Sequence, residues 1–145
     1  MSEHSESRQL VVFTLGAEHY ALPIQQVHEI IRYSQPRSVA SRAEWVRGVI
    51  SLRGRIVPVY DLAARLGVNS ELSDQTKIVI VESGDETAGV IVDDVDEVLT
   101  IEDAQIEEIP SADSALIDSI AKVDYRLVVL LKPTTIFTGI DLAAA

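Results

Sequence analysis

The sequence has no cysteine, so neither a disulfide nor a thiolate metal site can form. Aromatic residues are also scarce, at 5% of 145 residues, although the hydrophobic share is 47%. We therefore expect a core of Val, Ile, Leu and Ala. No apolar run approaches the roughly 18 residues of a membrane span, and no charged-then-apolar leader opens the chain. These absences indicate a globular, cytoplasmic protein without direct membrane insertion.

Positively charged residues are few as well. The chain has 12 Lys and Arg against 23 Asp and Glu, which gives a net charge of −11. Such a chain repels phosphate backbones and anionic headgroups, which disfavours binding to nucleic acid or to a membrane surface. The three histidines, His4, His19 and His28, show no ligand spacing, so we expect no metal. Glycines occur singly and form neither a P-loop nor a dinucleotide fingerprint, so we expect no cofactor.

Residues 47–62, RGVISLRGRIVPVYDL, form the segment around which the chain is organised. Their β-branched residues predict two strands, over 49–52 and 55–60, joined at Arg53 and Gly54. Gly54 permits the positive φ of a two-residue turn and leaves Arg53 displayed at the tip. After the hairpin, Asp61 and Gly67 are suited to cap a short helix at its two ends.

An internal repeat indicates the architecture. Residues 12–31 correspond without a gap to residues 80–99, so that Gly16 aligns with Gly84 and Glu29 with Glu97. The hairpin of the first half is also repeated in the second half, at an offset of 71 positions that aligns Arg55 with Arg126. The repeat predicts a mainly β protein of two tandem small barrels with a groove between them. We place a disordered tail at residues 1–8 and a single domain at 9–145, with subdomains at about 9–68 and about 76–140.

The sequence offers few candidate catalytic groups. Asp93, Asp94, Asp96 and Glu97 could form a divalent-cation site or an acid/base pair. Alternatively, these carboxylates lie on the solvent face of a strand whose inward residues are Val92, Val95 and Val98, and we favour this interpretation. Ser51 and Ser119 could act as nucleophiles only beside a general base, and no local sequence signature indicates one. We therefore expect a protein that is not an enzyme.

Two charged residues, Glu29 in QQVHEIIR and Arg53 in ISLRGRI, are embedded in apolar sequence. They are either solvated or joined in a surface salt bridge, or they pair at the edge of a binding surface. In the second case the planar guanidinium of Arg53 would hold a carboxylate in fixed geometry.

The chain resembles the CheW family of chemotaxis coupling proteins. The resemblance rests on LVVFTLGAEHYALPIQQVHEII, RGVISLRGRIVPVYDLAARLG, AGVIVDDVDEVLTI and AKVDYRLVVLL, and it covers residue 9 to about residue 138. It implies two five-stranded, SH3-like barrels with short helices. It also implies a cytoplasmic adaptor, monomeric when free, that joins the cytoplasmic tip of chemoreceptors to the regulatory domain of a CheA-type histidine kinase. Such an adaptor would be recruited to membrane-associated receptor arrays.

By this resemblance, Glu29 is the acid of the family's V-x-E-I segment and Arg53 the arginine of its L-R-G turn, and the two form an ion pair near the receptor groove. The remaining residues implied for the receptor and kinase surface or its support are Val27, Gly48, Gly54, Val95 and Val98. The chain departs from the family pattern at Ser51, at Ser119 and at Lys132-Pro133, and the last departure bears on the C-terminal helix and its kinase contact.

One alternative from another class is a tandem barrel that binds nucleic acid, which the net charge disfavours. A metal-assisted hydrolase that uses residues 93–97 is a second alternative. Because no kinase or response-regulator domain accompanies the motifs, we expect a free coupling protein.

Overall fold

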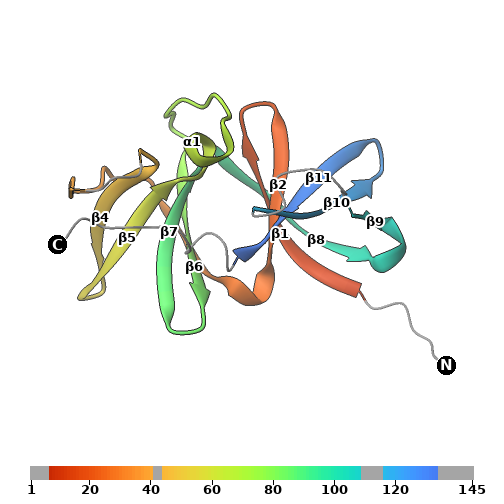
Figure 1. Ribbon diagram of the computed structural model, residues 1–145, viewed down its shortest axis with the longest axis horizontal. Coiled ribbons are helices and arrows are strands. Elements are labelled where there is room, and N and C mark those ends of the chain that lie inside the picture. Colours follow the sequence, from red (N-terminus) through yellow and green to blue (C-terminus); the bar gives the residue numbers. More distant parts are fainter. Residues whose placement is uncertain (1–6, 41–43, 109–115, 134–145) are drawn as a thin grey trace.

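The computed structural model describes residues 7–40, 44–108 and 116–133 (Figure 1). Most of these residues lie in strands. In chain order the elements are β1 (Ser7–Leu15), β2 (Glu18–Pro23), the 3-10 helix η1 (Ile24–Gln26), β3 (Val27–Arg32), β4 (Val46–Leu52), β5 (Arg55–Asp61), α1 (Leu62–Leu66), β6 (Lys77–Ser83), β7 (Glu86–Val92), β8 (Asp94–Glu102), the 3-10 helix η2 (Asp103–Gln105), β9 (Ile106–Glu107), β10 (Ile117–Val123) and β11 (Arg126–Leu131). The mainly β fold class is confirmed.

The strands form two sheets that lie side by side, as Figure 1 shows. The five-stranded sheet has the order β3-β6-β7-β5-β4, and the six-stranded sheet has the order β8-β1-β2-β11-β10-β9. The two orders are the same once repeat-equivalent strands are matched, because β1, β2, β8, β10 and β11 replace β6, β7, β3, β4 and β5. The short β9 is an addition at one edge of the larger sheet.

The expected subdomain boundaries are wrong in strand membership, because each sheet contains the first hairpin of the other half of the chain. Hairpin β1–β2 pairs with β8 and β11, and hairpin β6–β7 pairs with β3 and β5. The parallel pairings share one register, with Val59 opposite Gly89 in one sheet and Leu130 opposite Ala21 in the other. A repeat cannot reveal this exchange, since equivalent hairpins offer equivalent partners whether or not they are swapped.

Four β-bulges also follow the repeat. The extra residue is His28 in β3 and Asp96 in β8, which are aligned positions of the repeat. It is Arg47 in β4 and Asp118 in β10, which are aligned through the second hairpin. A bulge bends its strand and re-aims the side chains beside it, so the two sheets are bent at matching places.

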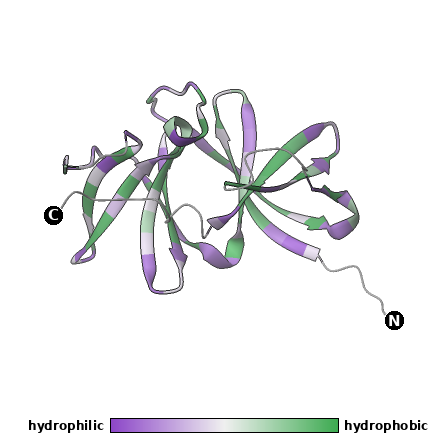
Figure 2. Cartoon of the chain, in the orientation of Figure 1, coloured by the Kyte–Doolittle hydropathy of each residue, from purple (hydrophilic) through white to green (hydrophobic). Residues whose placement is uncertain are grey.

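The described residues form three apolar clusters, and the largest lies between the sheets. Phe13, Leu22 and Leu131 from the six-stranded sheet pack there with Val79, Val90 and Tyr60 from the five-stranded sheet. A second cluster lies within the six-stranded sheet and a third within the five-stranded sheet. The central strands β6 and β7 carry continuous buried runs, as strands covered on both faces do, whereas exposure alternates along β3 (Figure 2). The sheets therefore share a core as well as strands.

The organising hairpin and its helix are confirmed. Leu52 pairs with Arg55 across the turn, and the Asp61 carboxylate accepts a hydrogen bond from the Ala64 backbone N–H at 3.1 Å. Gly67 ends α1 with φ 74°. Arg47 strengthens this corner, since its guanidinium donates to Asp61 at 2.8 Å.

The tail prediction is wrong for two residues. Ser7 and Arg8 belong to β1 and pair with Glu102 and Ile101, and residues 1–6 lie outside the described part. The C-terminal helix expected after Lys132-Pro133 also falls outside the described residues. Within residues 7–40, 44–108 and 116–133, no helix is long and apolar enough to cross a bilayer.

Candidate functional site

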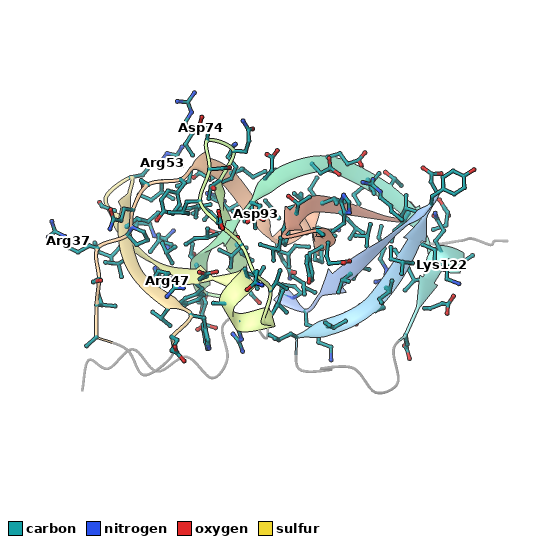
Figure 3. All side chains as sticks on the ribbon, turned by 90° about the horizontal axis from the view of Figure 1, so that it is seen from above. Arg37, Arg47, Arg53, Asp74, Asp93 and Lys122 are labelled. Carbon is teal, nitrogen blue, oxygen red and sulfur yellow. The ribbon has the colours of Figure 1, made fainter. Side chains whose placement is uncertain are left out.

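The tip of the β4–β5 hairpin displays a charged side chain because of its backbone. Arg53 and Gly54 both have positive φ, at 52° and 81°, which is the combination of a two-residue turn that follows the twist of its strands. The Arg53 side chain remains 71% exposed. Figure 3 shows Arg53 at the periphery of the five-stranded sheet.

Glu29, on β3, is the partner of that arginine. The Arg53 guanidinium donates through Nη1 to the Glu29 carboxylate. The expected meeting of these residues is therefore confirmed. The hydrogen bond from Arg53 is the main reason why the pKa of Glu29 is lowered, and Glu29 in turn raises the pKa of Arg53. Each charge thus stabilises the ionised form of the other.

A histidine and a second carboxylate adjoin the pair. The Nε2 of His28 lies 4.0 Å from Glu29 Oε2, and its Nδ1 lies 3.6 Å from Glu82 Oε1 on β6. A small cavity of about 120 Å³ is lined by His28, Glu29 and Glu82 together with Arg53, Arg55, Thr87 and three apolar residues. The site is thus a cluster of charged groups around a shallow hollow.

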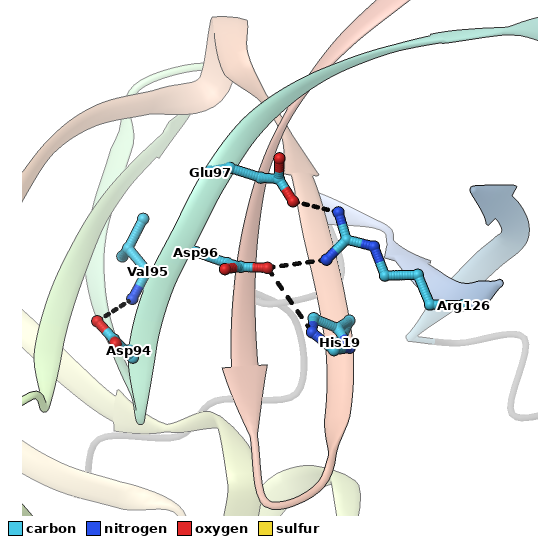
Figure 4. Close-up of polar contacts among 6 residues, drawn as sticks. All are labelled: His19, Asp94, Val95, Asp96, Glu97 and Arg126. Atoms are coloured by element: carbon cyan, nitrogen blue, oxygen red, sulfur yellow. Dashed lines mark hydrogen bonds and ion pairs between the residues drawn. The ribbon is translucent and has the colours of Figure 1, made fainter. Parts of the chain in front are cut away.

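The six-stranded sheet carries a similar cluster around Asp96 and Glu97, which align with His28 and Glu29 (Figure 4). Arg126 donates to Asp96 at 2.9 Å and also to Glu97, and the pKa of Arg126 is raised, chiefly by the hydrogen bond to Glu97. His19 lies 3.7 Å from Asp96. Here one guanidinium bridges two adjacent carboxylates, whereas Arg53 contacts one.

Exposed apolar side chains accompany both clusters. Ile30 and Ile56 are 40% and 69% exposed on the five-stranded sheet. Their repeat equivalents, Val98 and Leu127, are 55% and 54% exposed on the six-stranded sheet. An ion pair with aliphatic neighbours in the open is a composition suited to docking a protein partner.

Comparison with known proteins places this arrangement in a family. Residues 9–141 match the family model described as CheW-like domain. The chain belongs to the CheW-like family. Among solved structures, the fold is similar to that titled crystal structure of scaffolding protein TtCheW from Thermoanaerobacter tengcongensis. That likeness has a TM-score of 0.82 and 37% identity, and it covers 88% of this chain and 90% of the other.

Curated relatives include Chemotaxis protein CheW of Klebsiella aerogenes, which is 36% identical over 74 residues, or 51% of this chain and 45% of the relative. Chemotaxis protein CheW of Bacillus subtilis is 33% identical over 81 residues, or 55% and 52%. Protein PilI of Pseudomonas aeruginosa is 35% identical over 74 residues, or 48% and 40%. These alignments span about half the length of the curated relatives.

The CheW-like domain brings some expected site residues together and separates others. Gly54 adjoins Arg53, whereas Val27 and Val95 are partly buried against the core between the sheets. The inward placement of Val98 is wrong, because a strand has a period of two and Val98 shares its exposed side with Thr100. The spacing 92, 95 and 98 is a period of three, which a strand does not keep.

Gly48 supports the fold of the CheW-like domain for a steric reason. Its φ is 138°, and a Cβ there would lie 2.0 Å from the Arg37 carbonyl oxygen. That carbonyl accepts a hydrogen bond from the Val49 N–H at 2.9 Å, which fixes the segment before β4 against the strand. Ser119, the repeat equivalent of Gly48, is buried without any such glycine requirement.

The carboxylates at 93–97 have separate roles in the CheW-like domain. Asp93 accepts hydrogen bonds from the Gly16 N–H at 2.7 Å and from the Ser70 hydroxyl, and so joins the β1–β2 turn to the loop after α1. Figure 3 places Asp93 between the two sheets. Asp96 and Glu97 bind Arg126. In the described part of the chain, no group of three or more potential ligands could hold a metal.

Sequence reasoning missed His28, Glu82 and the whole Arg126 cluster. The repeat carried a signal for the cluster, since it aligned Glu97 with Glu29 and Arg126 with Arg55. No sequence signal marked His28 as a bulge residue, because a bulge adds one residue without a fixed residue type.

Proposed function

We propose that this chain is a non-enzymatic scaffold that couples methyl-accepting chemoreceptors to a CheA-type histidine kinase. Its partners would be the cytoplasmic tip of the receptor and the regulatory domain of the kinase. The chain would be monomeric when free, and cytoplasmic until recruited to membrane-associated receptor arrays. The observation that carries this proposal is the likeness, over 88% of the chain, to a solved structure titled as a scaffolding protein.

The Glu29–Arg53 pair is the centre of the proposed docking surface. Arg53 projects from a hairpin tip, and in the described part of the chain Glu29 is its ion-pair partner. A guanidinium that uses only some of its N–H groups can still donate hydrogen bonds to a carboxylate of a partner. Ile30 and Ile56 supply apolar area on the same sheet.

The other residues of the proposed surface mainly support its structure. Gly48 and Gly54 set the course of the β4–β5 hairpin. Val27 and Val95 pack against the shared core from the two sheets, so they fix the sheets beneath the surface. Val98 is the member that the six-stranded sheet would expose to a partner.

A double-mutant cycle tests this proposal. Glu29→Arg and Arg53→Glu each create a like-charge contact, which we expect to weaken binding to a receptor-tip fragment or to a kinase regulatory domain about tenfold or more. The double swap restores opposite charges and should recover part of that loss. Strictly additive losses would show that the two residues contact partners independently.

The chain offers a control in the Lys122–Glu107 ion pair of β10 and β9, whose cation is 63% exposed against 71% for Arg53. Figure 3 places Lys122 far from Arg53, near the other end of the protein. Lys122→Glu should leave binding near the wild-type level. Equal binding by wild type, both single variants and the double variant would remove Glu29 and Arg53 from the docking surface.

A further inference from the structure

His28 is the extra residue of the bulge in β3, and the bulge directs its ring toward two carboxylates. Val27 pairs with Val81 and Glu29 pairs with Ile80, so His28 has no partner of its own in the ladder. Its ring nitrogens lie 4.0 Å from Glu29 and 3.6 Å from Glu82. The nearest Glu29 oxygen, Oε2, is the atom to which Arg53 donates. The imidazole and the guanidinium therefore approach the same oxygen.

Polar side chains from four strands and one turn surround His28. Glu29 lies on β3 itself, Glu82 on β6, Arg53 in the β4–β5 turn and Arg55 on β5. On β7 the neighbour is Thr87, whose hydroxyl accepts a hydrogen bond from Arg55 at 3.4 Å. With a neutral imidazole, two carboxylates balance two guanidiniums. A proton on His28 leaves this cluster with one net positive charge.

We propose that His28 is a positioning residue of the docking surface, and that its protonation loosens Arg53 from Glu29 so that Arg53 can bind a carboxylate of the partner. The proposal rests on the proposed scaffold function. A protonated imidazole competes for the oxygen that holds Arg53 and repels the guanidinium. Imidazole is also the side chain that ordinarily changes charge between pH 5 and pH 8.

The six-stranded sheet lacks this arrangement at the aligned position. Asp96 occupies the bulge there and joins Glu97 in holding Arg126. A carboxylate at the bulge strengthens the hold on the arginine throughout the neutral pH range. The histidine contact in that cluster comes instead from His19 on β2, which lies beside Asp96. The exchange of acid for imidazole at the bulge therefore makes the Arg53 site responsive to protons.

The first test uses the free chain and needs no partner. Nuclear magnetic resonance should follow the His28 ring protons and the Arg53 Nε–H signal from pH 5.5 to pH 8, with Arg53→Lys to assign the latter. We expect the Arg53 signal to move with the same midpoint as the His28 ring in the wild type and to stay constant in His28→Gln. An Arg53 signal that is constant in the wild type, or that moves equally in His28→Gln, would overturn the proposal.

The second test measures the affinity for a receptor-tip fragment at pH 5.5 and pH 8 at constant ionic strength. We expect the wild type to bind about fivefold more tightly at pH 5.5, the effect of one unit charge at about 4 Å in water-like surroundings. His28→Gln should bind equally at both pH values, and His28→Arg should bind tightly at both. His19→Gln, the matched control at the other cluster, should keep the wild-type dependence.

The two proposals fail in different ways. A fragment that binds no variant at either pH contradicts the scaffold function, and the resonance test then decides the role of His28. A fragment that binds while His28→Gln retains the wild-type pH dependence contradicts the role of His28 and leaves the scaffold function standing.

Discussion

The two sheets carry similar ion clusters, in which the bulge and its carboxylate are aligned in the repeat but the arginines are not. Arg126 aligns with Arg55, whereas Arg53 aligns with Asp124. In both, a bulge on the first strand of the sheet order brings a carboxylate to an arginine of the facing hairpin. The five-stranded sheet has His28 at its bulge and an arginine at the hairpin tip that is 71% exposed. The six-stranded sheet has Asp96 at its bulge, and Arg126, only 28% exposed, bridges two acids.

This difference separates a structural ion cluster from one available to a partner. Arg126 has two carboxylates within reach, so its charge is satisfied inside the protein. Arg53 has one carboxylate, Glu29, and its own side chain is 71% exposed. A surface ion pair adds little to stability, and its value lies in the orientation it gives to exposed charges. The comparison thus favours the five-stranded sheet as the docking side.

The largest expected effect tests whether the sheets are independent at all. Truncation after Gly67 would leave hairpin β1–β2 without β8 and β11, and β3, β4 and β5 without β6–β7. We expect this fragment to show no cooperative unfolding in urea, followed by circular dichroism.

Mixing residues 1–67 with residues 68–145 should restore a cooperative transition, because each sheet draws strands from both pieces. A first fragment that unfolds cooperatively alone, with a stability near that of the full chain, would contradict the shared architecture. Fragments that stay unfolded when mixed would argue against the exchange of hairpins.

The second effect compares Gly48 with its repeat equivalent, Ser119. Gly48→Ala places a Cβ 2.0 Å from the Arg37 carbonyl oxygen at φ 138°, so the Arg37–Val49 contact must break. We expect the free energy of unfolding to fall by about 3 kcal/mol in urea titrations. Ser119→Ala keeps an existing Cβ and should cost about 1 kcal/mol or less. Equal losses would mean that the segment around Arg37 moves aside without cost.

The local parts of this fold could be predicted from sequence because their signals are local. The turn residues Arg53 and Gly54 placed the hairpin, and Asp61 and Gly67 placed the ends of α1. The meeting of Glu29 with Arg53 followed only from the family resemblance, since the two residues are 24 positions apart.

The remaining features depend on relations between elements that no residue type encodes. The exchange of hairpins is invisible in a repeat, because swapped and unswapped pairings bury the same side chains. Bulges at His28 and Asp96 change which side chains face a neighbour without a sequence signature. The wrong placement of Val98 came from reading a period of three along a strand.

The third effect compares the two arginines. Arg126→Gln leaves Asp96 and Glu97 adjacent, with His19 beside Asp96, whereas Arg53→Gln leaves Glu29 separated from Glu82 by His28, with Arg55 nearby. We expect Tm at pH 7 to fall by about 3 °C in the first variant and by about 1 °C in the second. Added salt at about 1 M should shrink this difference, since screening weakens the repulsion between the carboxylates. A larger loss from Arg53→Gln would reverse the assignment of structural and docking clusters.

The smallest effect isolates the charge of Glu29 by its dependence on pH. Because the pKa of Glu29 is lowered from 4.5, first by the hydrogen bond from Arg53, the native state favours the ionised carboxylate more than the unfolded state does. The resulting stability is present above pH 4.5 and is lost as the pH falls through the lower native pKa. Glu29→Gln should therefore melt about 1 °C below the wild type at pH 7, and this difference should shrink toward zero as the pH falls below 4.5. Thermal melts followed by circular dichroism over a descending pH series measure this. A difference that persists in acid would assign the contribution of Glu29 to packing of its side chain on β3 rather than to its ion pair with Arg53.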